Sequence, residues 1–272
     1  MIEAAPLPPL SPRQPTGGPR FQRLRVIAAL IIRDMSARFG RSAGGYFWAL
    51  AEPLGGILLL SVAFQFALRS PPIGTSFMLF YATGIIPMTT YNSMQQAVMK
   101  TVSSNRGLLS YPPVTLIDAV IAKFLLNTLT SGVVAAVLFS SIILYDGLYV
   151  TLSPGPLVAG FLLAALLGLG VGSVNCVLTG FFPTWRNIWA VITRPLFILS
   201  GVFFLYESVP PGFQHILWWN PLVHVIGLLR AGIFATYQAD FVSYPYILGV
   251  SLGLFAVGGW LMRRHAAWLI EQ

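Results

Sequence analysis

The residue types that most often perform chemistry in proteins are few in this sequence, and they are widely spaced. The three histidines lack the spacing of metal ligands, and the lone Cys176 excludes both an intrachain disulfide and a cysteine-based zinc cluster. The two lysines, Lys100 and Lys123, do not follow a glycine-rich phosphate cradle. The acids within apolar segments, Glu52 and Asp118, stand near segment ends and not as a pair at bilayer depth. We therefore expect neither an ATP site nor a proton relay in this chain.

Polar side chains gather instead at one end of an apolar segment, Phe77–Met99. Hydroxyl and amide groups fill most positions there: Thr89, Thr90, Tyr91, Asn92, Ser93, Gln95 and Gln96. Such groups have no partners in lipid, so they should face a wet path, another helix or the cytoplasm. The next stretch, Lys100–Val114, predicts a small helix stopped by Pro112 and Pro113. That helix could transmit the motion of a partner protein, or it could be an ordinary connection.

Aromatic rings are abundant, with 19 Phe, 10 Tyr and 7 Trp. Most should pack in the core or at the membrane interfaces. Some could line a conduit and stack against sugars. Phe64, Tyr81 and Tyr91 are the first candidates, because their segments also carry polar groups such as Gln65 and Asn92.

The composition shows which elements must position these residues. Of 272 residues, 56% are hydrophobic and 9% are charged, and the mean hydropathy is +0.76. A soluble domain is roughly a quarter charged, and a soluble chain of this length would need more charge to cover its surface. The chain is therefore expected to be a membrane protein that crosses the bilayer several times.

About 20 apolar residues cross a bilayer as a helix. Six segments reach that length: Trp48–Leu68, Phe77–Met99, Leu116–Tyr145, Leu157–Phe182, Ile188–Tyr206 and Tyr244–Met262. Between the last two, Val209–Phe234 is apolar but broken by prolines, which favours two short re-entrant helices shielded by protein. The expected fold is an all-α membrane protein with six transmembrane helices and a re-entrant helix pair between spans five and six.

The ends of the chain differ from this membrane domain, which is expected over residues 46–265. Residues 1–20 hold six prolines and predict a disordered tail. Residues 21–45 predict an amphipathic helix, because apolar side chains recur at helical spacing: Phe21, Leu24, Ile27, Ala28, Ile31, Met35 and Phe39. This helix could anchor to lipid, or it could also dock a cytoplasmic partner. Residues 266–272 are expected to be a cytoplasmic C-terminus.

The basic residues predict the orientation. With the N-terminus inside, 12 cations fall on inner segments: Arg13, Arg20, Arg23, Arg25, Arg33, Arg38, Arg41, Lys100, Arg106, Arg186, Arg263 and Arg264. Only Arg69 and Arg230 fall on outer segments. The positive-inside rule therefore places both termini in the cytoplasm. The formal charge of +8 needs no nucleic acid to explain it.

Three alternating glycines, Gly168, Gly170 and Gly172, lie within the fourth predicted span. Their spacing does not make a dinucleotide-binding loop. Small residues four apart, such as Gly168 and Gly172, are typical of close helix packing in membranes.

Four blocks of sequence carry a family resemblance. They are RDMSARFG at Arg33–Gly40 with YFWALAEP at Tyr46–Pro53, NRGLLSYPPVTLID at Asn105–Asp118, SGVFF at Ser200–Phe204, and WWNPLVH at Trp218–His224 followed by Arg230. Each block alone is weakly specific, but four in order on six spans are specific together. From about residue 25 to its end, the chain resembles the ABC-2 permease family, most closely the permeases that export capsular polysaccharide.

The resemblance implies a half-transporter of the bacterial inner membrane. Two copies would form a channel for a lipid-linked acidic polysaccharide, and two cytoplasmic ABC ATPase chains would drive it with ATP and Mg. This chain itself would bind no cofactor. Periplasmic and outer-membrane partners would receive the glycan. An O-antigen or teichoic-acid exporter, a drug or lipid permease of the same fold, and a membrane scaffold that transports nothing are the alternatives.

The resemblance also implies roles for particular residues. Those expected to couple the permease to its ATPase are Arg33, Asp34, Arg38, Asn105, Arg106, Leu108, Leu109, Tyr111 and Pro112. Arg194 and Arg230 join Phe64, Tyr81, Tyr91 and Asn92 as candidates for the path, since arginines suit a polyanion. Each arginine could instead extend to the bilayer surface or pair with an acid such as Glu207.

Overall fold

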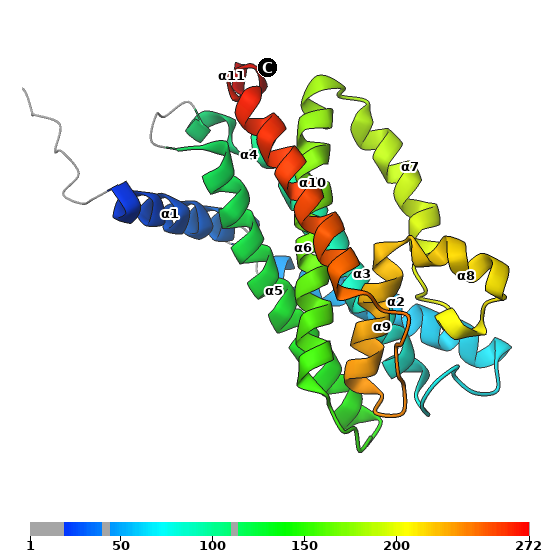
Figure 1. Cartoon of the computed structure of the whole chain (residues 1–272). Helices are drawn as coiled ribbons and strands as arrows, with labels where there is room; N and C mark the ends of the chain where they lie inside the picture. The colour runs from blue at the N-terminus through cyan, green and yellow to red at the C-terminus, as the bar shows by residue number, and fades with distance from the viewer. Residues whose placement is uncertain (1–18, 40–43, 110–113, 272) are drawn as a thin grey trace, which may run out of the picture.

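The computed structural model describes residues 19–39, 44–109 and 114–271, and this part of the chain is all-helical, as expected (Figure 1). The elements are α1 (Pro19–Phe39), α2 (Gly44–Ala67), α3 (Phe77–Met99), α4 (Thr101–Leu109), α5 (Leu116–Tyr145), α6 (Pro154–Phe181), α7 (Trp185–Ile198), the 3₁₀ turn η1 (Tyr206–Ser208), α8 (Pro211–Trp218), α9 (Pro221–Ile233), α10 (Tyr244–Arg264) and α11 (Ala266–Glu271).

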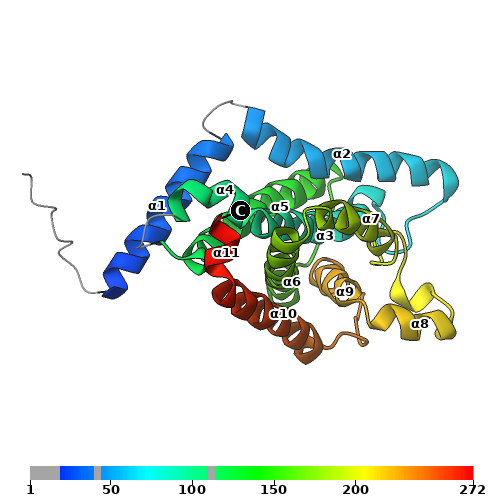
Figure 2. The ribbon, with the colours of Figure 1, turned by 90° about the horizontal axis from the view of Figure 1, so that it is seen from above.

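The long helices form a bundle around α6. Seen from above, α6 stands at the centre and is surrounded by α3, α5, α9 and α10 (Figure 2). Helices α1 and α2 lie crosswise to α6 in Figure 1, and Figure 2 shows that α2 follows one edge of the bundle.

Four described helices are long and apolar enough to cross a membrane: α2, α5, α6 and α10. They correspond to the first, third, fourth and sixth predicted spans, and the third has the expected bounds. The predicted pair after the fifth span is present as α8 and α9, which meet at a bend of 100° and would count as a fifth crossing if taken as one span. The structure therefore supports four or five spans by length and composition.

Two predicted spans differ from these four. The second is helix α3, with the expected bounds, but its polar end leaves it less apolar than the others. The fifth, Ile188–Tyr206, is wrong as a continuous helix, because α7 ends at Ile198. Pro195 lacks an amide hydrogen, and Gly201 has a φ of +85°, a left-handed conformation that favours glycine. Fourteen helical residues extend about 21 Å, short of a bilayer core of about 30 Å.

Glycines bring α6 close to its neighbours on two sides. A Cβ at Gly168 would lie 2.8 Å from the Tyr91 carbonyl oxygen of α3, and one at Gly172 would lie 2.8 Å from that of Gln95. On another side, a Cβ at Gly170 would lie 2.5 Å from the Ser251 carbonyl oxygen of α10. The predicted packing role of Gly168 and Gly172 is thus confirmed, because only glycine allows these backbones to approach so closely.

Helix α5 begins with a capping box, which explains why Asp118 stands at the start of an apolar segment. The Thr115 hydroxyl accepts a hydrogen bond from the Asp118 amide at 3.2 Å, and the Asp118 carboxylate accepts one from the Thr115 amide at 3.3 Å. These bonds satisfy two amides at the helix start, where no intrahelical partner exists. Asp118 therefore has a structural role.

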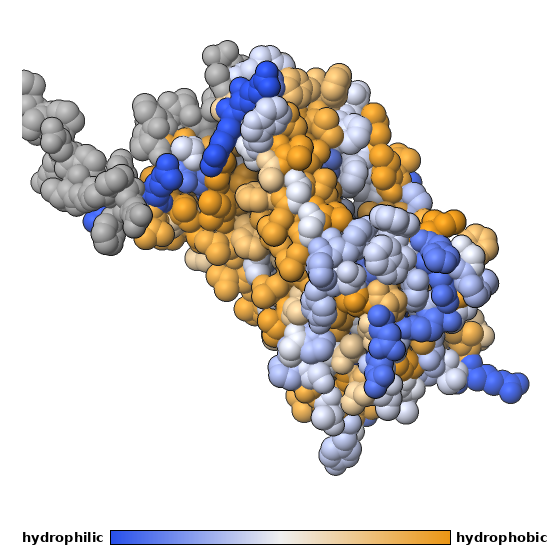
Figure 3. All heavy atoms as spheres, in the orientation of Figure 1, coloured by the Kyte–Doolittle hydropathy of each residue, from blue (hydrophilic) through white to orange (hydrophobic). Residues whose placement is uncertain are grey.

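The outer surface of the bundle is apolar where lipid would cover it. Leu125, Leu129, Val133 and Val137 recur every four residues along α5, and Leu129 is 68% exposed. Figure 3 shows the apolar area that extends across α5 and α10, with hydrophilic residues toward the upper end and the lower right. A band of this kind suits contact with acyl chains, in agreement with a membrane protein.

The helix boundaries in the N-terminal segment differ from the predicted ones. Residues 1–18 of the expected tail lie outside the described part, while Pro19 and Arg20 already belong to α1. The expected helix over 21–45 ends at Phe39, and α2 begins at Gly44. Of its apolar side chains, Ile27 and Ile31 pack toward α5, whereas Leu24 and Met35 are exposed. The exposed side chains form a second apolar face, so α1 can contact both protein and lipid.

The close approach of α6 to α3 can be tested with one methyl group. In Gly172→Ala the new Cβ would meet the Gln95 carbonyl oxygen and the Val98 Cβ, both at 2.8 Å, so the helices must separate. We expect a loss of about 1–3 kcal/mol in stability, the usual cost of overpacking, seen as a lower thermal midpoint in detergent. Gly253→Ala on α10, where nothing lies within 4 Å, is the control. Equal midpoints for the two variants would contradict the packing role.

Candidate functional site

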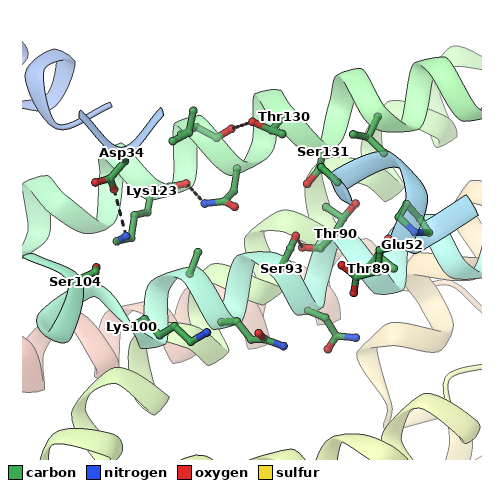
Figure 4. A pocket seen from close by; sticks show the side chains of 18 of the residues that line it. Asp34, Glu52, Thr89, Thr90, Ser93, Lys100, Ser104, Lys123, Thr130 and Ser131 are labelled. Atoms are coloured by element: carbon green, nitrogen blue, oxygen red, sulfur yellow. Dashed lines mark hydrogen bonds and ion pairs between the residues drawn. The ribbon is translucent and has the colours of Figure 1, made fainter. Parts of the chain in front are cut away.

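A cavity of about 790 Å³ opens beside the polar end of α3. Figure 4 labels ten of its polar lining residues: Asp34 of α1, Glu52 of α2, Thr89, Thr90 and Ser93 of α3, Lys100 directly after α3, Ser104 of α4, and Lys123, Thr130 and Ser131 of α5. Residues from the first five helices of the chain, α1 to α5, thus enclose one polar space, which we call the α3–α5 cavity. Much of the polar stretch of α3 borders this cavity, which corresponds to one of the three surroundings that the sequence left open.

Most hydroxyl groups of this cavity donate their protons to carbonyl oxygens of their own helices. Thr89 and Thr90 both donate to the Ile86 carbonyl oxygen at 2.9 Å, and Ser93 donates to that of Thr90 at 3.1 Å. Across the cavity, Thr130 donates to the Leu126 carbonyl oxygen at 2.8 Å. Each hydroxyl oxygen still has lone pairs that accept hydrogen bonds. The walls therefore suit water or a ligand rich in hydroxyl donors.

Four polar residues connect α1, α4 and α5 at one end of the α3–α5 cavity. Asp34 accepts hydrogen bonds from Lys123 of α5 at 3.2 Å and from its neighbour Arg33 at 2.5 Å. The Arg33 guanidinium also donates to the Asn105 side chain of α4, whose amide in turn donates to the Thr101 carbonyl oxygen at 2.9 Å. We call Arg33, Asp34, Asn105 and Lys123 the α1 clasp. It joins the crosswise helix to the short helix and to a long one.

Apolar packing supports the α1 clasp. Leu30 of α1 is buried against Ala119 and Ala122 of α5. The side chains of Asp34 and Lys123 are only 15% and 11% exposed, so water screens their attraction less than at an open surface. Removing the Asp34 carboxylate would leave Lys123 partly buried without its charged partner, which is costly.

The structure brings together three of the nine predicted coupling residues, namely Arg33, Asp34 and Asn105. Arg106 lies on the same helix as Asn105 and is exposed. The remaining five fall where less or nothing is described: Arg38, Leu108 and Leu109 belong to α1 and α4 but their side chains lie outside the described part, and Tyr111 and Pro112 lie outside the described residues.

The aromatic path candidates lie within the packed core. Phe64 of α2 packs on Tyr81 of α3 with ring centroids 5.4 Å apart. Tyr81 and Tyr91 are buried, and Tyr91 faces α6 near Gly168. In this conformation they support α3 and do not border either of the two cavities described here.

The two arginines of the predicted path have different surroundings. Arg194 of α7 is exposed and borders a second cavity, of about 700 Å³, which Asn92 of α3 also lines. Arg230 of α9 is 2% exposed and donates to the carbonyl oxygens of Phe204 at 2.8 Å and Val202 at 3.2 Å. Its guanidinium also stacks over the Phe80 ring at 4.4 Å. Arg230 therefore holds the segment after α7 against α3 and α9.

Glu207 does not form an ion pair with Arg230 in the described structure. Its carboxylate accepts a hydrogen bond from the Tyr237 hydroxyl, at 3.0 Å to one oxygen and 3.2 Å to the other. Burial and the neighbouring Glu207 charge raise the pKa of Tyr237 above its ordinary value, so the phenol stays protonated and donates. This contact joins η1 to the segment after α9.

Sequence reasoning did not select either of the two lysines as a candidate site residue. Lys123 completes the α1 clasp, and Lys100 borders both cavities. The spacing of Lys123 from Asp34, 89 residues away, gives no local signal, because only the fold brings them together. Among the described residues, no group of three His, Cys, Asp or Glu side chains could hold a metal ion.

Comparison with known proteins adds family information to this geometry. A family model described as ABC-2 type transporter matches residues 25–234. The chain is 31% identical to the polysialic acid transport protein KpsM of Escherichia coli over 85% of this chain and 90% of that one. It is 27% identical to the capsule polysaccharide export inner-membrane protein CtrC of Neisseria meningitidis (86% and 88%) and 24% identical to BexB of Haemophilus influenzae (86% and 88%), which bears the same description.

The α1 clasp can be tested by exchanging its charges. Asp34→Lys puts like charges together and should release α1 from α5, whereas adding Lys123→Asp should restore docking in part. Docking is measured as disulfide formation between cysteines at Leu30 and Ala119 in a Cys176→Ala background. We expect the single variant to cross-link several-fold more slowly than the parent.

A second cysteine pair in the same background serves as the control. Ala164 and Val225 lie in one buried cluster where α6 meets α9, away from α1. Their cross-linking should be the same in all variants. If Asp34→Lys cross-linked α1 to α5 as fast as the parent, the clasp would not hold α1 in place.

Proposed function

The chain belongs to the ABC-2 type transporter family of membrane proteins, and we propose that it is the permease subunit of an ATP-driven exporter of capsular polysaccharide. The observation that carries this proposal is similarity along most of the chain to inner-membrane proteins of capsule export, at 31% identity over 85% of its length. The protein is a multi-pass protein of the inner membrane and supplies the membrane part of the exporter.

The structure supports a conduit because it combines an apolar exterior with polar interior cavities. The α3–α5 cavity carries hydroxyl acceptors and three cations, and it is large enough to admit sugar units. Glycans are rich in hydroxyl donors, which match these acceptors. Helix surfaces that contact lipid need no such polar groups. A hydroxyl-rich solute therefore accounts for the polar lining of the cavity.

The crossings of the membrane are completed by α3 and by α7 with the segment after it, which gives six spans with both termini in the cytoplasm. Twelve basic residues then lie on the inner side, in keeping with the positive-inside rule. The α8–α9 pair is re-entrant from the outer side. Two copies of the chain form the channel.

ATP is hydrolysed by two separate ABC ATPase chains, with Mg, on the cytoplasmic side. They contact α1 and α4, which the α1 clasp joins to α5. Motion of the ATPase at α4 therefore reaches α1 and α5 through Asn105, Arg33, Asp34 and Lys123. The substrate is a lipid-linked acidic polysaccharide, and periplasmic and outer-membrane partners accept it after export.

Deleting the chain tests the proposed function in cells that lack a second permease of this kind. Surface glycan should disappear while lipid-linked glycan accumulates inside, and the plasmid-borne chain should restore the surface glycan. Replacing the ATPase subunit with a variant that cannot hydrolyse ATP should cause the same loss of surface glycan. Immunoblots and mass spectrometry of fractionated glycan measure both pools. Normal surface glycan in the deletion strain would contradict the proposal.

Coupling is tested by charged substitutions in the segment that ends α4. Leu108→Glu, Leu109→Glu and Tyr111→Glu together should lower glycan exported per ATP hydrolysed by at least about tenfold, since 1.4 kcal/mol of lost contact already gives tenfold. Membrane insertion should not change. The control is Tyr149→Glu, at a fully exposed position between α5 and α6. Full export by the triple variant would refute α4 as the ATPase contact.

A further inference from the structure

The last described helix, α11, lies beside α4 at one end of the bundle (Figures 1 and 2). It has only six residues, too few for a stable isolated helix, so packing must hold it in place. The backbone hydrogen bonds of α10 continue across His265. Its amide donates to the Leu261 carbonyl oxygen, and its carbonyl oxygen accepts from the Leu269 amide, both at 3.0 Å. Helix α11 is therefore an extension of α10 that reaches α4.

Side chains of this extension fit the end of α6. The Trp268 ring stacks on Phe181 with ring centroids 4.6 Å apart and planes at 22°, and His265 meets the same ring edge-on at 5.1 Å. The Leu269 side chain is 1% exposed and lies over Gly180, where a Cβ would overlap the Leu269 Cδ2 atom. Aromatic stacking and a leucine seated on a glycine thus fix the position of α11.

Helix α4 depends on its neighbours in the same way, because nine residues do not make a stable helix alone. Its buried face carries Thr101, Val102 and Asn105. Asn105 belongs to the α1 clasp. Val102, one turn earlier, belongs to a buried apolar cluster that also contains Leu269. Two connections therefore lead away from α4, one to α1 and α5 and the other to α11.

The second connection leads to the centre of the bundle. The cluster that holds Val102 and Leu269 also contains buried side chains of α3, α5, α6 and α10, among them Val98, Leu116, Val177 and Met262. Helix α10 is closely packed on α6, since a Cβ at Gly258 would lie 2.7 Å from the Ser173 Cβ. A displacement of α4 against α11 thus reaches α6 and α10, which contribute no residue to the α1 clasp.

We propose that α11 is a second coupling element of the permease, in which Leu269 and Trp268 are positioning residues that hold α4 where the ATPase engages it. Motion of the ATPase at α4 reaches α5 through the α1 clasp, and it reaches α6 and α10 through α11. Because α3 packs on both α5 and α6, the two connections act on it from two sides. This inference rests on the proposed function, because it takes α4 to be the ATPase contact.

Coupling is measured in the complete transporter, reconstituted with its ATPase and lipid-linked glycan, as glycan exported per ATP hydrolysed. Leu269→Ala should lower this ratio at least about tenfold, because the packing lost from a buried leucine outweighs the energy of a tenfold change. Leu269→Met nearly keeps the volume and should retain most of the ratio. The matched control is Ile247→Ala, at a fully buried position near the start of α10. It should lower the thermal midpoint but not the ratio.

Gly180→Ala moves α11 without leaving a hole. The new methyl group overlaps the Leu269 Cδ2 atom, so the leucine must shift and α11 with it. We expect the ratio to fall, as in Leu269→Ala. Combining the two substitutions should restore the ratio in part, because the methyl group then occupies space that the leucine leaves. Gly253→Ala on α10, where nothing lies within 4 Å, is the control and should keep the wild-type ratio.

Cys176, the only cysteine of the chain, reports the position of α4 without an export assay. Its side chain is 2% exposed, and its sulfur lies close to the backbone amides of Thr101 and Val102. When α11 no longer holds α4 over this thiol, a small neutral maleimide gains access to it. The reaction should be at least about tenfold faster in Gly180→Ala than in the wild-type chain. In Ile247→Ala the rate should not change.

Each outcome has a separate meaning. If the wild-type transporter does not export glycan when it hydrolyses ATP, the proposed function fails. If it does, and both Leu269→Ala and Gly180→Ala keep the wild-type ratio, the role of α11 is overturned while the function stands. If export and hydrolysis fall together with the thermal midpoint, α11 only stabilises the fold, and the proposal is likewise overturned. Equal maleimide rates in the wild-type chain and in Gly180→Ala would show that α11 does not hold α4.

Discussion

Polar side chains within a bilayer need either a protein partner or water. Helix α3 meets this requirement in different ways on its two sides. Toward α6 it presents backbone and apolar side chains, which Gly168 and Gly172 allow to approach closely, and Gln95, whose side-chain oxygen accepts a hydrogen bond from Asn175 at 3.4 Å. Away from α6, its hydroxyl and amide side chains border two cavities. The rest of the fold follows from this division, because α5, α7 and α1 are placed around the polar end of one buried helix.

The same arrangement connects the helices that we propose to contact the ATPase with the walls of the cavities. Helix α1, at one side of the bundle, is held to α5 by apolar packing and by the Asp34–Lys123 pair, and to α4 by Arg33 and Asn105. A force applied at α4 thus acts on a wall of the α3–α5 cavity. Lys100 follows α3 directly and borders both cavities, so a shift of this end changes both at once.

Periodicity and composition predicted much of the fold. Lipid sets the length of a span and does not tolerate backbone N–H and C=O groups without hydrogen-bond partners. The bounds of α3 and α5, the glycine contacts of α6 and the α8–α9 pair all follow from such local signals. The continuous fifth span was wrong because hydropathy does not register the left-handed turn at Gly201. The crosswise course of α2 depends on contacts between distant segments, which an apolar run does not encode.

The site was less predictable for a related reason. Polar residues on α3 and the block around Arg33 could be recognised one segment at a time. The clasp to Lys123 and the grouping of Lys100 with Arg186 and Trp189 require the packed helices, since no spacing in the sequence relates them. Arg230 illustrates the converse: a charge expected to line the path donates to backbone carbonyl oxygens in the core.

The most direct test of the account is water access to the polar face of α3. In a Cys176→Ala background, Ser93→Cys places a thiol in the α3–α5 cavity, while Met94→Cys places one at the next position, where the native side chain is fully buried. The assembled transporter is treated with a charged, membrane-impermeant thiosulfonate. The account predicts that the cysteine at position 93 reacts at least about tenfold faster than the one at 94. Equal rates at the two positions would contradict a wet conduit along α3.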